Sequence, residues 1–157
     1  MQFVETARVL EAKVLNLCMK SPKRYTFFLT SEIMHLASMV HNEVRSANNT
    51  YPRNRHEAQK RRDHLIEGNN ALMNLIPKLG LLYDALLENP EGQKWCDNAI
   101  SEIAGLIKEE KKLIRSTKRA DRDRYRNLPT DGLHFPEEEE AEDTEEEDSE
   151  DSEDARD

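Results

Sequence analysis

Residues 95–126 read WCDNAISEIAGLIKEEKKLIRSTKRADRDRYR, and they combine a core seam with the largest concentration of positive charge in the chain. At about 100° per residue, the apolar side chains of this segment fall within roughly 60° of one another, as burial against other helices requires. They are Cys96, Ile100, Ile103, Ile107 and Ile114. The pattern predicts a long helix that packs in a bundle.

A second arc of the same helix is basic, about 120° wide and centred roughly 90° from the seam. We call its residues the basic ridge: Lys108, Lys111, Lys112, Arg115, Lys118, Arg119, Arg122 and Arg126. The acids Glu109, Glu110, Asp121 and Asp123 fall off this arc. A one-sided cationic surface predicts contact with a polyanion, and the alternative is an ordinary solvated face.

Three more helices are expected before it, over residues 2–20, from 30 or 31 to 48 or 49, and 54–88, because apolar residues recur at steps of three and four. The predicted seam of the third helix is Ala58, Leu65, Leu72, Ile76, Leu79, Tyr83 and Leu86. Pro77 should bend that helix, since proline removes one backbone hydrogen bond. No run alternates with period two. The sequence predicts an all-α, antiparallel up-down four-helix bundle over residues 1–126.

Charge divides the chain into a basic body and an acidic tail. Residues 137–157 hold 15 acids and one arginine, a charge of −14, whereas residues 1–136 hold 22 basic and 17 acidic side chains, a charge of +5. Residues 127–157 are therefore expected to be a connector and a disordered tail. The tail is either a solubilising segment or a segment that competes with nucleic acid for the basic ridge.

The linker at residues 21–29 carries aromatic rings among cations. Lys23, Arg24, Tyr25, Phe27 and Phe28 lie within six positions. One interpretation is that some of the rings plug the end of the bundle. The other is that Lys23, Arg24, Tyr25 and Phe27 bind a partner protein or stack on bases.

A second basic cluster opens the third helix, with Arg53, Arg55, Arg61 and Arg62 as candidate nucleic-acid contacts. These side chains spread around the helix rather than sharing one arc. The cluster is therefore either ordinary surface or a site that becomes strong only where an assembly brings several copies of the chain together.

Sequence motifs for catalysis are missing, so the protein is not expected to be an enzyme or to need a cofactor. There is no Gly-x-Ser-x-Gly elbow and no glycine-rich phosphate loop. The pair Glu32 and His35 has no second copy, so no metal site is expected.

Cys18 and Cys96 are expected to be buried free thiols, which is typical of cytoplasmic proteins. No segment is apolar enough to suggest a membrane span.

The order of these elements resembles one bacterial family of four-helix bundles. The resemblance rests on Pro22, Lys23, Tyr25 and Leu29, on Ala47-Asn48, on Leu65, Leu72 and Ile76, and on residues 102–108, EIAGLIK. It covers roughly residues 3–118. The family contains proteins encoded in intervening sequences of ribosomal RNA and the accessory variability protein of diversity-generating retroelements.

That resemblance implies a homopentamer with a basic exterior. It also implies binding of template RNA or cDNA and, in the retroelement branch, docking on the reverse transcriptase. The functional prediction is therefore a non-enzymatic accessory protein of reverse transcription. The alternative is a helical scaffold whose basic ridge binds an acidic protein without nucleic acid.

Overall fold

The computed structural model describes residues 2–88 and 93–130, and it confirms the all-α bundle. Its helices are α1 (Gln2–Lys20), α2 (Ser31–Asn49), α3 (Arg55–Leu87) and α4 (Gln93–Tyr125). A short 3₁₀ turn η1 (Lys23–Tyr25) and a π-helical turn η2 (Thr26–Thr30) join α1 to α2. The described residues contain no strand. The acidic tail expected to be disordered lies outside them.

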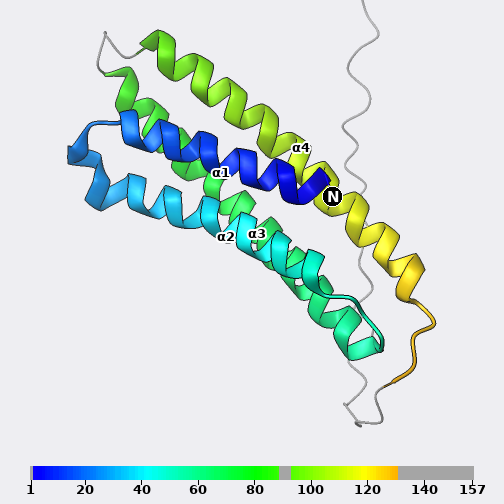
Figure 1. Cartoon of the computed structure of the whole chain (residues 1–157). Coiled ribbons are helices and arrows are strands. Elements are labelled where there is room, and N and C mark those ends of the chain that lie inside the picture. The colour runs from blue at the N-terminus through cyan, green and yellow to red at the C-terminus, as the bar shows by residue number, and fades with distance from the viewer. Residues whose placement is uncertain (1, 89–92, 131–157) are drawn as a thin grey trace, which may run out of the picture.

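Neighbouring helices run antiparallel and are joined by polar contacts (Figure 1). Glu11 of α1 contacts His41 of α2, and Glu43 of α2 contacts His64 of α3. α4 closes the ring, because it packs against both α3 and α1. Figure 1 shows the up-down path, with the α1–α2 connection at one end of the bundle and the α2–α3 connection at the other.

The core includes the predicted seam of α4 and the apolar residues that recur at steps of three and four in α1. In α1, Phe3, Ala7, Leu10, Val14 and Leu17 are all buried. In α4, Cys96, Ile103, Ile107 and Ile114 are buried and Ile100 is half-buried. These two helices therefore face the interior with the sides that their apolar periodicity selects.

The seam predicted for α3 was partly wrong. Ile76 is 42% exposed and Tyr83 lies at the rim, whereas Leu75 and Leu82 are completely buried. The buried arc of α3 is broad because α2 and α4 both pack on it, so it includes leucines that a narrow seam omits. The Tyr83 hydroxyl donates a hydrogen bond to Asp97 Oδ1 over 2.7 Å, as a polar tip at a rim requires.

α2 and α3 approach each other closely at Gly68. A Cβ atom at this position would lie 3.3 Å from Val44 Cγ2, so a larger side chain would require Val44 to shift. Further along, α3 is one continuous helix through Pro77. The prediction of a single helix rather than a break is confirmed there.

The start of α3 is fixed by a reciprocal cap, and this cap lies next to the candidate site. The Asn54 side chain accepts a hydrogen bond from the Glu57 backbone N–H over 2.8 Å. Glu57 Oε2 in turn accepts one from the Arg53 backbone N–H over 2.7 Å. Side-chain acceptors of this kind satisfy N–H groups that the first helical turn leaves unpaired.

α4 extends beyond the beginning of α1. Gln2, at the start of α1, donates a hydrogen bond to Glu109 of α4, and Figure 1 shows α4 continuing past this point. Most of the basic ridge therefore belongs to a part of α4 that α1 does not cover.

Candidate nucleic-acid interface

The first turns of α3 and the last turns of α4 enclose a basic groove of about 260 Å³. Five cationic side chains line it, together with Ala58, Gln59, Leu65, Asp121 and Tyr125. The cations are Arg55 and Arg62 from α3 and Lys118, Arg122 and Arg126 from the end of the ridge. Antiparallel packing thus joins the two basic clusters within one chain.

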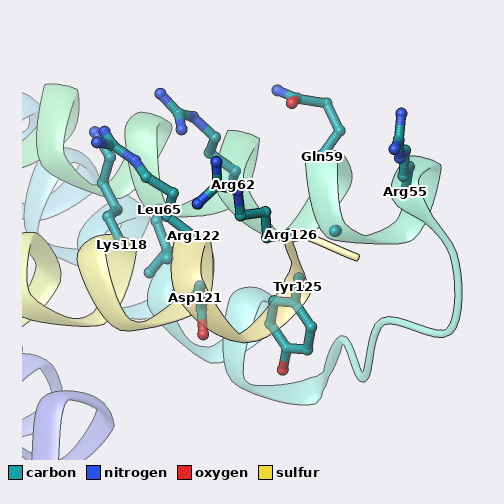
Figure 2. Close-up of a pocket in the computed structure, with 10 residues that line it drawn as sticks. Arg55, Gln59, Arg62, Leu65, Lys118, Asp121, Arg122, Tyr125 and Arg126 are labelled. Atoms are coloured by element: carbon teal, nitrogen blue, oxygen red, sulfur yellow. The ribbon is translucent and has the colours of Figure 1, made fainter. Parts of the chain in front are cut away.

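The cationic groups of the groove share one side of the helix pair. In Figure 2, the side chains of Arg62, Lys118 and Arg122 point in a common direction, with Arg126 beside them, while Asp121 and Tyr125 point away. Guanidinium and ammonium groups brought together in this way can contact successive phosphates of one backbone.

The remainder of the ridge continues the positive surface along α4. The side chains of Lys108, Lys111, Lys112, Arg115 and Arg119 are exposed. Lys118 is half-buried at the junction with α3. The structure therefore presents one cationic band that begins in the groove and runs toward the middle of α4.

Arg61 was wrongly assigned to this surface. Its side chain is only 4% exposed, and its Nε donates to Asp121 Oδ2 over 2.5 Å. Its Nη1 donates to the backbone carbonyls of Ala47 and Thr50 over 2.5 and 3.2 Å. Arg61 thus ties the end of α2 to α3 and α4, and it cannot contact a ligand without breaking these bonds.

Arg55 lines the groove and also holds the segment that follows α4. Its backbone N–H donates to the Pro129 carbonyl over 3.0 Å, and its Nε donates to the Leu128 carbonyl over 3.2 Å. The segment after α4 therefore folds back onto the start of α3. Arg53, just before α3, is exposed but does not line the groove.

The candidate partner site in the linker divides into a buried and an exposed part. The Tyr25 hydroxyl donates to the Ala85 carbonyl of α3 over 3.2 Å and accepts a hydrogen bond from Arg24. Tyr25 therefore plugs the bundle end, as one interpretation predicted. Phe27 and Phe28 are 84% and 80% exposed, with their ring centroids 5.2 Å apart. With the exposed Lys23, Phe27 remains available to a partner.

Sequence reasoning missed a buried acid in α4. Glu110 is completely buried, and neither of its carboxylate oxygens has a hydrogen-bond partner. Burial, together with the nearby charge of Glu109, raises the pKa of its carboxyl to about 8. Its helical phase places it beside Ile103 and Ile107 in the seam, which is the signal that could have identified it.

The other reactive groups do not form a second site among the described residues. Burial raises the pKa of the Cys18 thiol to about 11, and it also raises the pKa of the Cys96 thiol, so neither forms a thiolate readily. The part of the chain that the structure describes contains no cluster of three or more histidine, cysteine or acidic side chains suited to a metal. Within the same part, every helix is too short or too polar to cross a membrane.

Comparison with known proteins gives no match to a family model, a curated protein or a solved structure. The geometry of the groove and of the bundle ends is therefore the basis for assigning a function.

Proposed function

We propose that this protein is a non-enzymatic nucleic-acid-binding accessory factor whose basic groove and ridge hold a phosphate backbone. The observation that carries the proposal is the groove itself, in which Arg55 and Arg62 of α3 lie with three cations from the end of the basic ridge. Lysine and arginine contacts to phosphates give affinity without reading sequence. The bound polymer is template RNA or cDNA.

The resemblance to accessory variability proteins extends this proposal to a partner and an assembly. In that role the protein docks on the reverse transcriptase of a diversity-generating retroelement and supports cDNA synthesis as a homopentamer. The linker end supports a docking function, since Phe27 and Phe28 are exposed there beside Lys23 and the groove lies at the opposite end of the bundle. A protein partner and a nucleic acid could thus be bound at the same time.

The direct test is fluorescence anisotropy with labelled single-stranded RNA and DNA across a range of salt concentrations. If the five groove cations contact five phosphates, the slope of log K against log salt concentration is about −3.5 for a single strand. The double variant Arg122→Glu/Arg126→Glu should weaken binding at least tenfold, because charge-assisted hydrogen bonds contribute about 1.5–3 kcal/mol each.

The matched control is Lys20→Glu/Arg45→Glu, which makes the same change of charge at exposed positions on α1 and α2. It should retain the affinity of the native protein. Equal losses in the two double variants would show that net charge, not the groove, determines binding. Affinity that barely changes with salt would overturn the phosphate-binding proposal and favour the alternative, a scaffold that binds an acidic protein.

A further inference from the structure

The structure gives the chain after α4 a defined starting point at the basic groove. Arg55 holds the carbonyl groups of Leu128 and Pro129, so the last described residues lie at the groove rim. From Pro129, eight positions lead to Glu137, where the acidic tail of residues 137–157 begins. The acidic tail is therefore tethered within a few residues of the five groove cations.

Chain dimensions allow the tail to reach this groove in the same molecule. An extended chain spans at most about 3.3–3.6 Å per residue, so eight residues reach up to about 29 Å. Helical rise places Arg55 and Arg62 only about 10 Å apart along α3, and Lys118 and Arg126 about 12 Å apart along α4. The first acids of the tail can therefore contact any cation of the groove.

We propose that the acidic tail, residues 137–157, occupies the basic groove of its own chain as an electrostatic competitor of nucleic acid. The inference rests on the proposed function of the same groove, and it adds regulation to it. A tethered segment has an effective concentration of order mM. Non-specific polyanion sites have dissociation constants of about 0.1 mM or lower. Because the effective concentration exceeds that dissociation constant about tenfold, the tail should weaken nucleic-acid binding about tenfold. A long polymer with many phosphates displaces the tail more readily than a short oligonucleotide does.

The first test detects the tail in the groove without any nucleic acid. A nitroxide on Ser149→Cys in the full chain should broaden the amide NMR signals of residues 118–126 at about 0.01 M salt, where the Debye length is about 30 Å. The broadening should vanish at about 1 M salt, where that length is about 3 Å. The signal of Lys20, which ends α1 at the opposite end of the bundle, is the internal control. Unchanged signals of residues 118–126 at low salt would overturn the inference.

The second test uses the full-length chain with the 15 acids of residues 137–157 changed to their amides. This variant should bind a short single strand about tenfold more tightly than the native chain at low salt, and equally tightly at high salt. If Arg122→Glu/Arg126→Glu abolishes binding but the amidated tail leaves affinity unchanged, the inference fails and the proposed function stands. If the nitroxide broadens the groove signals but no chain binds nucleic acid, the proposed function fails and the tail contact stands.

Discussion

Two charged residues, Arg61 of α3 and Glu110 of α4, are buried in the bundle, and they differ in whether the protein supplies hydrogen-bond partners. Arg61 donates to Asp121 and to the carbonyls of Ala47 and Thr50. Glu110 is more completely buried, yet both of its carboxylate oxygens lack a partner. A buried charge is tolerated when its hydrogen bonds are made within the protein, and otherwise it is neutralised by a proton.

The difference explains how each residue contributes to the fold. Arg61 joins three helices next to the basic groove, so its charge stabilises the geometry of the site. Glu110 retains its proton well above the usual range, because its pKa is about 8. It therefore behaves as a neutral side chain in acid and as a destabilising charge in base.

The largest expected effect comes from removing the partnered charge. Arg61→Ala should lower the free energy of unfolding by about 3–5 kcal/mol, because it leaves the Asp121 carboxylate and two carbonyls without their donor. Urea denaturation followed by circular dichroism measures the loss. The exposed Arg45→Ala is the control and should change stability by less than about 0.5 kcal/mol. The double variant Arg61→Met/Asp121→Leu should recover most of the loss, and a failure to do so would mean that charge pairing is not the cause.

Removing the unpartnered charge of Glu110 should raise stability rather than lower it. Glu110→Leu should raise the free energy of unfolding by about 2–4 kcal/mol at pH 8 or above, within the limit of about 5 kcal/mol set by the pKa difference. The carboxyl has a pKa near 4.5 in the unfolded chain and about 8 in the folded one. The native protein should therefore lose stability relative to the variant as the pH rises from about 4.5 to 8. Parallel stability curves over this range would contradict the assignment.

The smallest effect should come from the exposed neighbour of Glu110. The charge of Glu109 is the second cause of the raised pKa of Glu110. Glu109→Gln should therefore lower that pKa slightly and raise stability at pH 8 by less than about 1 kcal/mol. The same denaturation series at several pH values measures it. A larger gain than that of Glu110→Leu would show that exposed repulsion, not burial, dominates.

Most of the fold could be predicted from helical periodicity and end signals. The breaks at Ser21-Pro22, Asn48-Asn49 and the start of α3 follow from local chemistry, which depends on a few adjacent residues. The exact core face of α3 could not be predicted in this way. It depends on how α2 and α4 cross that helix, and so Leu75 replaces Ile76 in the interior.

The two buried charges show a more specific failure of sequence reasoning. At about 100° per residue, Glu110 lies only about 20° from Ile103, and Arg61 lies on the buried arc of α3 with Leu79. Helical phase placed both residues inside, but their charge argued for the surface. The groove also could not be predicted from the sequence, because Arg62 and Arg122 are 60 positions apart.

The overhang of α4 beyond α1 has a consequence for hydrogen exchange. Backbone amides exchange through local opening, and segments with fewer packed neighbours open at lower free energy. The part of α4 after Glu109 extends past the start of α1, and the Arg61–Asp121 bond attaches it to α3. Its amides should exchange faster than those of residues 96–107, so the helix that carries the groove can fray while the rest of the bundle stays folded.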